Sequence, residues 1–419
     1  MHPMVKPALR RGWRDLQYVQ FGVTPAHAVV VGPVDTTTGS LLGLLDGTRG
    51  MALLREEARA LGVPDAWLEA LLARLAGAGL LEDAAARDPA AEALRRREGV
   101  LDRLRPDAAS LSVVHREPGG AIRRLGARAG LRVQVRGAGR VGASVAALLS
   151  AAGVGRVEVL DGGCVEPWDV VPGGLPAEAV GERRDVAARR LVSRSAPGGR
   201  AVRAARRPGA GPAGSSGGSS AGSSAGSSGG SSGMAEPGLA LVVVAPRDGL
   251  AVYAPDPVTA DGWVGTGTPH LFAGVLEATG VVGPLVLPGS TACARCLELA
   301  RTDGDPAWPR MLAQWRSGRR GPVPSGDVGL VSAVAGLAAA HALAFLDGEL
   351  PASAGARWEV SSPLLEWRAQ RVGPHGDCPC GAADGDAVGQ PGGTAVGKAG
   401  EGAGVRASGV GRGQDTMAG

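Results

Sequence analysis

The sequence predicts an α/β protein whose main domain has a mostly parallel sheet, preceded by a small domain of short strands and three helices. Three observations support this prediction. Apolar β-type runs alternate with helical patterns over residues 131–206, a glycine-rich turn joins the first of these runs to its helix, and amphipathic helical patterns fill residues 36–79. Strands that alternate with helices along a chain are typical of parallel sheets.

Composition narrows the functional classes. The chain has 419 residues, enough for two or three domains, and its net charge of +4 comes from arginines that are spread out rather than gathered in a basic stripe. We therefore expect no nucleic-acid surface. The first 22 residues lack the apolar core of a signal peptide, and the longest apolar run, 328–346, contains small residues and His341. We expect that run to form a buried helix rather than a membrane span, in a cytoplasmic protein.

Residues 1–84 are predicted to form the small N-terminal domain. Short β-type runs come first, then three helical patterns, of which the first is expected to begin with threonine caps and to stop at Gly47, and then a short closing strand. These segments are 16–22, 26–32, 36–47, 50–62, 64–79 and 80–83. This order describes a small winged helix. Taken by itself, such a unit is compatible with DNA binding or with a purely structural module.

Three further segments are a connecting segment, an insertion and a C-terminal tail. Residues 85–128 form a connecting segment, with a helix expected over 90–104 and a strand over 109–114. Residues 207–238 are a Gly/Ser-rich tract that cannot bury apolar area, so we expect a disordered insertion within one domain. The Gly-rich residues 382–419 are expected to be a disordered tail.

The glycine-rich turn has the spacing of a nucleotide-binding loop. Gly137, Gly139 and Gly142 follow a strand and open a helix, so their backbone could approach a phosphate at the helix N-terminus. Asp161 ends the next strand, where an acid can bind ribose hydroxyls. The alternative is a sheet that needs tight turns but binds nothing. A nicotinamide dehydrogenase is disfavoured, because no acid–base cluster accompanies the loop.

Two cysteine pairs suggest a metal site. Cys293-x-x-Cys296 and Cys378-x-Cys380 could bring four thiolates to one tetrahedral zinc, which would be structural because no coordination position stays open. A redox pair or unrelated buried thiols are the alternatives. Cys164 stands apart and is expected to be an ordinary small side chain. An odd number of cysteines does not indicate a disulfide framework.

The glycine loop, followed by the stretch from Gly283 to Cys296 and the second cysteine pair, resembles the ThiF family, the relatives of MoeB and of the ubiquitin-activating enzymes. The resemblance covers about residues 129–381. It implies a Rossmann-like fold, usually dimeric, with structural zinc on the four cysteines. Active members use ATP and magnesium to adenylate the C-terminal carboxylate of a small protein.

Several residues depart from the pattern of active members. The family expects a second acid two positions after Asp161, where this chain has Gly163, and an Arg-containing run where residues 167–174 have no arginine. A lysine on the next helix is matched only by Arg184. Asp248 is the candidate for the acid after the fourth strand, and Arg140 could replace the missing phosphate-contacting arginine. Use of ATP and magnesium is therefore doubtful, and the sequence leaves open whether the protein is an enzyme.

The N-terminal unit resembles the PqqD-like peptide-recognition elements of ribosomal-peptide modification enzymes, which bind a leader peptide as an added strand. Its fusion to a degenerate ThiF-like domain resembles the leader-binding component of azol(in)e cyclodehydratases. The resemblance implies a weakly catalytic or non-catalytic protein that binds a precursor peptide and presents it to an ATP-using YcaO-type partner. The alternatives are an active adenylyltransferase for a ubiquitin-like carrier protein, or a pure interaction protein.

Overall fold

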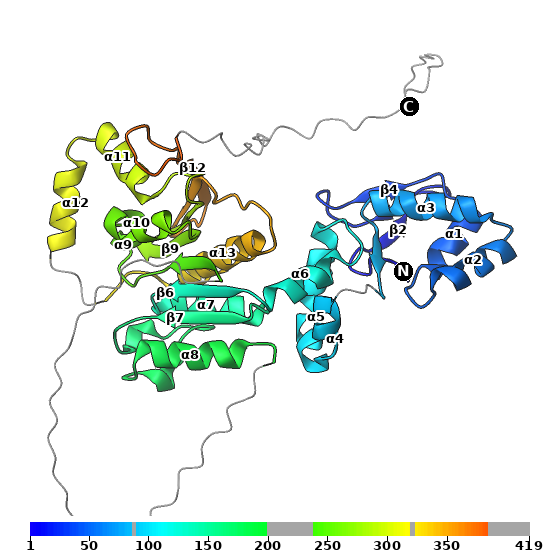
Figure 1. The fold of residues 1–419 in the computed structure, drawn as a ribbon, viewed down its shortest axis with the longest axis horizontal. Helices are drawn as coiled ribbons and strands as arrows, with labels where there is room; N and C mark the ends of the chain where they lie inside the picture. The colour runs from blue at the N-terminus through cyan, green and yellow to red at the C-terminus, as the bar shows by residue number, and fades with distance from the viewer. Residues whose placement is uncertain (86–88, 199–237, 319–322, 384–419) are drawn as a thin grey trace, which may run out of the picture.

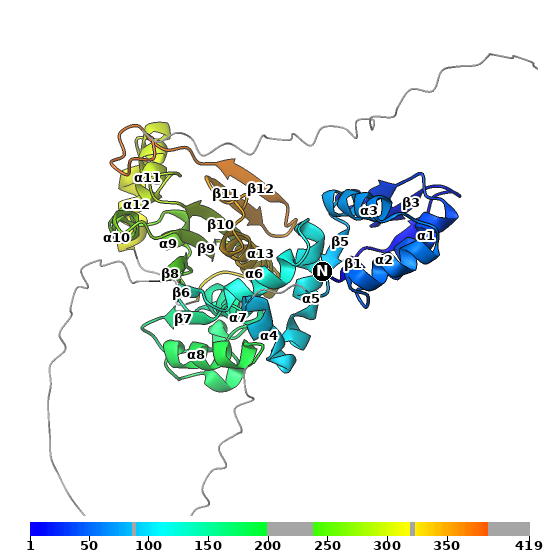
Figure 2. The ribbon, with the colours of Figure 1, turned by 45° about the vertical axis from the view of Figure 1, so that its right-hand side comes forward.

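The computed structural model describes residues 1–85, 89–198, 238–318 and 323–383. The predicted tail (382–419) lies outside these residues except for Ala382 and Ala383, and the predicted Gly/Ser insertion (207–238) lies outside them except for Gly238. Helices α4 (Pro89–Arg95), α5 (Glu98–Val114) and α6 (Gly120–Arg128) lie between the N-terminal strands and helices and the main sheet (Figures 1 and 2).

The N-terminal unit contains two small sheets and three helices. The three helices and the strands β3, β4 and β5 lie in the predicted segments, whereas the sequence does not predict β1 and β2. Strands β2, β3 and β4 form an antiparallel sheet in that order, and β1 pairs antiparallel with β5. The elements are β1 (Pro3–Val5), β2 (Arg11–Trp13), β3 (Val19–Phe21), β4 (Val29–Val31), α1 (Thr36–Leu44), α2 (Met51–Ala60), α3 (Asp65–Gly77) and β5 (Leu81–Asp83). The expected threonine cap is wrong: Asp35 caps α1, because its carboxylate accepts from the amide of Thr38 at 2.7 Å. The name winged helix stays a prediction.

The described part of the connecting segment contains three helices joined by short turns. It contains α4 (Pro89–Arg95), α5 (Glu98–Val114) and α6 (Gly120–Arg128). The strand expected over 109–114 is wrong, because these residues continue α5. Leu104, Ala108 and Leu111 recur at helical spacing and belong to one small apolar cluster with Leu125 of α6. This packing against a neighbouring helix outweighs the local preference of serine and valine for extended backbone.

The main domain is built on a seven-stranded sheet in the order β12-β11-β10-β9-β8-β6-β7. The predicted parallel sheet is confirmed for β7, β6, β8 and β9, and β10, β11 and β12 extend it with antiparallel pairs. The strands are β6 (Arg132–Arg136), β7 (Arg156–Leu160), β8 (Leu239–Val244), β9 (His270–Leu276), β10 (Thr279–Val286), β11 (Ala356–Ser361) and β12 (Trp367–Arg371).

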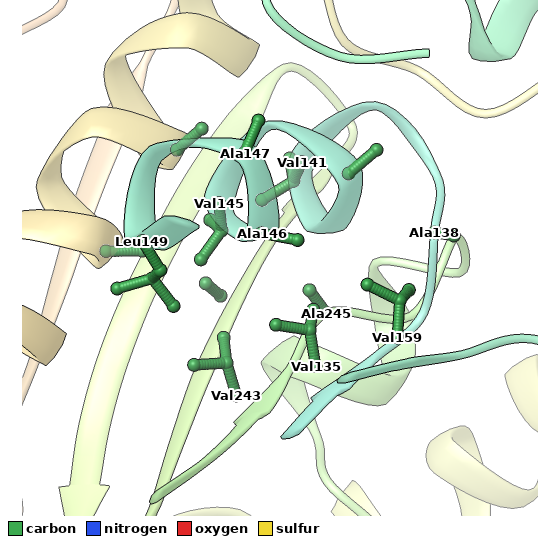
Figure 3. Packing of buried hydrophobic residues seen from close by; sticks show 14 of the residues in the cluster. Val135, Ala138, Val141, Val145, Ala146, Ala147, Leu149, Val159, Val243 and Ala245 are labelled. Atoms are coloured by element: carbon green, nitrogen blue, oxygen red, sulfur yellow. The ribbon is translucent and has the colours of Figure 1, made fainter. Parts of the chain in front are cut away.

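Helices cover both faces of this sheet. The helices are α7 (Arg140–Ala151), α8 (Arg184–Ser195), α9 (Leu250–Tyr253), α10 (Pro257–Gly265), α11 (Ala294–Gly304), α12 (Trp308–Ser317) and α13 (Val328–Leu346). Helices α7 and α13 share the largest apolar cluster with the sheet, whereas residues of α10 and α11 share another cluster with Phe272 of β9. Figure 3 shows how Val145, Ala146 and Leu149 of α7 face Val135 and Val243 of the strands. The small side chains of α7 let this helix lie close to the parallel strands.

Helix α13 is the long apolar run of the sequence. Among the described residues it is the one helix long and apolar enough to cross a membrane by length and composition. One side of the helix, which includes Leu330, Val331 and Val334, is buried in the cluster that also contains sheet residues. Its packing therefore agrees with the expected core helix along that side.

Candidate functional site

The glycine loop lies where the sequence predicts it, between β6 and α7. Gly137 has a φ of +108°, and a Cβ at this position would lie 2.0 Å from the carbonyl oxygen of Ala245. A Cβ at Gly142 would lie 2.1 Å from the carbonyl oxygen of Gly137. These two glycines are therefore required by the tight turn and by the close packing of α7 against the strands, whether or not a ligand binds.

The second glycine of the motif is covered by an arginine. In nucleotide-binding turns this glycine leaves room for the pyrophosphate to approach the backbone. Here a Cβ at Gly139 would lie 2.7 Å from Cγ of Arg247, a residue that follows β8. The stem of Arg247 thus lies over the part of the loop that faces the phosphate in other proteins of this fold type.

Asp161, the expected ribose-binding acid, is bonded within the chain. Its carboxylate accepts from the amide of Ala138 at 2.8 Å, from the amide of Gly163 at 3.0 Å and from Nε of Arg184 at 2.8 Å. Burial alone would raise the pKa of Asp161, but the two amides and the Arg184 guanidinium outweigh burial and hold this pKa below its ordinary value. The carboxylate is therefore ionised and already has three donors.

The position that departs from the family pattern makes room for Arg184. A Cβ at Gly163 would lie 2.0 Å from Nη2 of Arg184, so an acid could not stand there without displacing the guanidinium. Nη1 of Arg184 also donates to the carbonyl of Cys164 and lies 3.4 Å from Oδ2 of Asp169. Arg184 begins α8, as expected for the family's lysine, but its guanidinium is paired with carboxylates of the chain itself.

Arg247 and Arg184 share the same buried carboxylate. Nε of Arg247 lies 2.9 Å from Oδ1 of Asp169, and Nη2 lies 2.5 Å from Oε2 of Glu166. The side chain of Asp169 is only 1% exposed. We call Asp161, Glu166, Asp169, Arg184 and Arg247 the loop cluster. At neutral pH its formal charges, two positive and three negative, add up to −1.

Arg140, the candidate to replace the missing phosphate-contacting arginine, is bonded within the chain. Its Nη1 donates to the carbonyl of Gly326 at 2.5 Å, and its Nη2 to the carbonyl of Val170 at 3.5 Å. Arg140 thus joins the start of α7 to the segment that precedes α13. The sequence points to Arg140 and Arg184 but not to Arg247, whose only local signal is its position next to Asp248.

Asp248 lies at the edge of a cavity of about 850 Å³. Arg247 lines the same cavity, whose walls include the indoles of Trp308 and Trp315 and the carboxylate-bearing Glu277. The two indoles meet edge to face, with ring centroids 5.7 Å apart. Because Arg247 also covers Gly139, the cavity and the glycine loop are neighbours with this side chain between them.

The four predicted cysteine ligands come together. Cys293 caps α11, Cys296 lies in its first turn, and Cys378 and Cys380 follow β12. All four sulfur atoms lie within 4.8 Å of one another, with Cys293–Cys378 and Cys296–Cys380 separations of 3.6 Å. Sulfurs bound at about 2.3 Å to one tetrahedral zinc would lie about 3.8 Å apart, so this arrangement fits such an ion. Cys164 is exposed and is not part of the cluster.

The cysteine cluster already favours one thiolate. The thiol of Cys293 donates to the sulfur of Cys296 at 3.8 Å, and this contact lowers the pKa of Cys296 to about 4. Burial raises the pKa of Cys378 to about 11. A bound cation would supply the positive charge needed to ionise the remaining thiols. These residues can therefore hold a metal ion, and they join the segment after β12 to α11.

Comparisons with known proteins agree with this architecture. Residues 126–216 match the sequence profile of the ThiF family, which confirms the expected resemblance over that part of the chain. A comparison with curated protein sequences finds no match.

Solved structures extend the likeness in fold to most of the chain. E. coli MccB with ATP is 14% identical, with a TM-score of 0.60 over 91% of this chain and 99% of MccB. E. coli MccB with MccA-N7isoASN is 13% identical, with a TM-score of 0.62 over 91% of this chain and 100% of MccB. The heterocyclase TruD is 16% identical, with a TM-score of 0.55 over 91% of this chain but 43% of TruD.

Proposed function

We propose that this chain, which carries a ThiF-type domain, binds a ribosomal precursor peptide through its N-terminal unit and presents it to a separate, ATP-using YcaO-type enzyme. In this proposal the ThiF-type domain has little or no adenylating activity of its own. The observation that carries this part is the loop cluster. It places Arg247 over Gly139 and gives Asp161 three donors from within the chain.

Electrostatics explain why the loop cluster opposes adenylation. Activation of a carboxylate by ATP requires cations and magnesium around the phosphates, where negative charge develops. Arg184 and Arg247 are the two guanidinium groups of the loop cluster, and both already contact Asp169. Moving them toward a phosphate would weaken the pairing of a carboxylate that is almost fully buried, which is costly. Gly163 has no side chain with which to bind magnesium.

The edge of β4 supports the peptide-binding part of the proposal. The amide of Gly22 donates to the carbonyl of Arg10, and the amide of Arg14 donates to the carbonyl of Tyr18. The backbone N–H and C=O groups of alternate β3 residues therefore point toward β2. With Val19 opposite Val31 and Phe21 opposite Val29, the residue between them, Val30, directs its N–H and C=O away from β3.

An added strand could therefore pair with Val30. This edge is uncharged, since β4 consists of Val29, Val30 and Val31, and the side chain of Val30 is exposed. Edges of this kind accept an additional strand readily. The opposite edge, β2, carries the charged Arg11, and charged side chains disfavour the addition of a strand to an edge. The solved complexes of MccB with MccA concern a protein of similar fold and support a peptide as the ligand.

We further propose that the four cysteines hold one structural zinc. Their donor set is made of four thiols, and their mutual distances suit a closed tetrahedral site. The ion would supply no chemistry at the glycine loop. It would fix the segment after β12 against α11. A homodimer and a cytoplasmic location complete the proposal, both from the family resemblance and the sequence.

An active adenylyltransferase for a small carrier protein is the second candidate. The cavity of about 850 Å³ beside Asp248 favours it, because a chain terminus could reach the glycine loop from there if Arg247 moved. The structure of MccB with ATP, a protein of similar fold, also favours it.

Two assays separate these candidates. Short peptides encoded beside the gene are labelled with fluorescein, and their binding to the full chain is measured by anisotropy. ATP–pyrophosphate exchange is measured on the same preparation. Peptide binding with exchange at background supports presentation to a partner. Exchange well above background supports adenylation, and the absence of peptide binding would contradict the proposed function.

A further inference from the structure

Lys6 is one of only two lysines in the chain, although the chain has 44 lysines and arginines together. Its side chain is completely buried, and Nζ donates to the carbonyl of His115 at 2.8 Å and lies 3.5 Å from the carbonyl of Arg116. His115 is the C-cap of α5. Lys6 thus joins the N-terminal unit to the end of a helix that lies far away in sequence.

The hydrogen-bond acceptors of the ammonium group are carbonyls at the end of a helix, while the carboxylates of Glu82 and Glu117 act on it only through their charge. The ion pairs found among the described residues do not include Lys6. Carbonyls at a helix C-terminus carry partial negative charge and lack intrahelical donors, so they suit a compact ammonium group. Lysine offers such a point charge, whereas the broader guanidinium of arginine needs more room. This is a physical reason for a lysine at this position in a chain that mostly uses arginine.

Two more contacts hold the same junction. The carboxylate of Glu82, on β5, accepts from the amide of Gly119. The stem of Arg116 packs against Gly79: a Cβ at Gly79 would lie 2.8 Å from Cγ of Arg116. Gly79 has a φ of +74°, so this position favours glycine on backbone grounds as well. The β1–β5 ribbon is therefore fixed to the turn between α5 and α6 at three points.

The other side of this turn is fixed to the main domain. Arg128 of α6 makes a bidentate pair with Asp347, at 2.8 and 2.6 Å, and both side chains are less than 5% exposed. Arg128 also donates to the carbonyl of Ala152, at the end of α7. His115 lies 3.4 Å from Glu349. Residues 115–128 thus bind the N-terminal unit on one side and the C-terminal ends of α13 and α7 on the other.

We propose that Lys6 is a positioning residue that locks the N-terminal unit onto the α5–α6 turn and so fixes its orientation relative to the glycine-loop domain. The consequence for peptide presentation rests on the proposed function: a peptide on β4 would leave the N-terminal unit in one set direction. The lock itself does not depend on any peptide. Its failure and the failure of the proposed function can therefore be told apart.

Amine labelling of the wild-type chain tests the lock directly. The side-chain amines of the protein are Lys6 and Lys398, so acetylation by an N-hydroxysuccinimide ester can be followed at each by mass spectrometry. Burial lowers the pKa of Lys6 only in the folded protein. Once exposed, its amine should react about as fast as a free lysine, so slow labelling reports that the buried amine is inaccessible. We expect labelling at Lys6 to be at least about a hundredfold slower than that of N-acetyl-lysine methyl ester. Equal rates would overturn the proposal.

Hydrogen exchange on Lys6→Met distinguishes a lock from a general contribution to folding. We expect faster exchange of the Gly119 amide and of neighbouring amides in 115–120, while α1, α2 and α3 keep their protection. Arg55→Met, which removes a surface arginine paired with Glu69, is the matched control and should leave 115–120 unchanged. Loss of protection throughout the N-terminal helices, or unchanged exchange at 115–120 in Lys6→Met, would overturn the proposal.

Discussion

Nε of Arg184 lies 2.8 Å from Oδ1 of Asp161, and the two side chains are 10% and 9% exposed. Asp161, the acid expected to bind a ribose, is therefore paired with Arg184 of the same chain. The pair is also a structural interaction that can be measured, because both members leave water on folding and the loss of either partner leaves a buried charge.

Arg184→Met should destabilise the protein by about 2–4 kcal/mol at pH 7. The pKa of Asp161 is held below its ordinary 3.8, so the ionised carboxylate contributes stability above that pH and loses it as the pH falls through the folded-state pKa. The difference between wild type and Arg184→Met in urea unfolding should therefore shrink below about pH 4. Arg183→Met is the control: its pair with Asp185 is at the surface and should contribute little to stability. An equal difference at pH 3 and pH 7 would contradict this assignment.

The sequence predicts the backbone of this site well, because glycine spacing reports backbone constraints. Gly137 and Gly142 are needed by contacts with Ala245 and with the loop itself, and such contacts depend on local geometry. The cysteine pairs are also predictable, since short spacings place thiols on one turn. Tertiary ion pairs have no such spacing. Arg247 reaches Asp169 because β8 lies beside β6, and this neighbourhood of strands has no fixed spacing in the sequence.

Helices with a clear apolar period, such as α3, are predicted correctly, whereas the strand expected over 109–114 is wrong. A stretch of serine and valine is ambiguous by itself. The packing of Leu111 with residues of α6 stabilises the helical conformation of 109–114. This tertiary packing cannot be inferred from the residues of 109–114 alone.

Zinc should be present at one ion per chain, measured by inductively coupled plasma mass spectrometry on protein purified without chelator. Cys296→Ser should lose the metal and lower the melting temperature, because binding and folding are coupled at a site of four thiolates. Metal content should also fall as the pH is lowered, since thiols must lose protons to bind. Cys164→Ser is the control, because Cys164 lies outside the cluster, and it should keep the metal. Full zinc content in Cys296→Ser would contradict the assignment of these cysteines as zinc ligands.

Val30→Pro should weaken precursor-peptide binding at least about tenfold, which corresponds to about 1.4 kcal/mol. Proline removes the one N–H of β4 that the register directs away from β3, and edge strands tolerate proline on that side. Stability should change by about 1 kcal/mol or less. Val30→Ala separates the loss of the side chain from the loss of the donor and should bind nearly as well as wild type.

Arg11→Pro tests the opposite edge of the same sheet. The register of β2 against β3 directs the amide of Arg11 away from β3 as well, so this variant also removes an outward donor. Peptide binding should be retained in Arg11→Pro. If it is lost there and kept in Val30→Pro, the peptide adds to β2 instead.

ATP with magnesium should bind weakly, with a dissociation constant above about 1 mM by calorimetry, and pyrophosphate exchange should stay at background. The turn at Gly137 and the start of α7 keep the shape of a phosphate site. Arg247 nevertheless lies over Gly139, Asp161 already accepts from three donors within the chain, and the loop cluster has a net negative charge. Polyphosphate would have to break ion pairs of the buried Asp169 to obtain a cation.

Robust exchange that is lost in Asp161→Ala or Asp248→Ala, and kept in the surface control Asp185→Ala, would make the chain an adenylating enzyme.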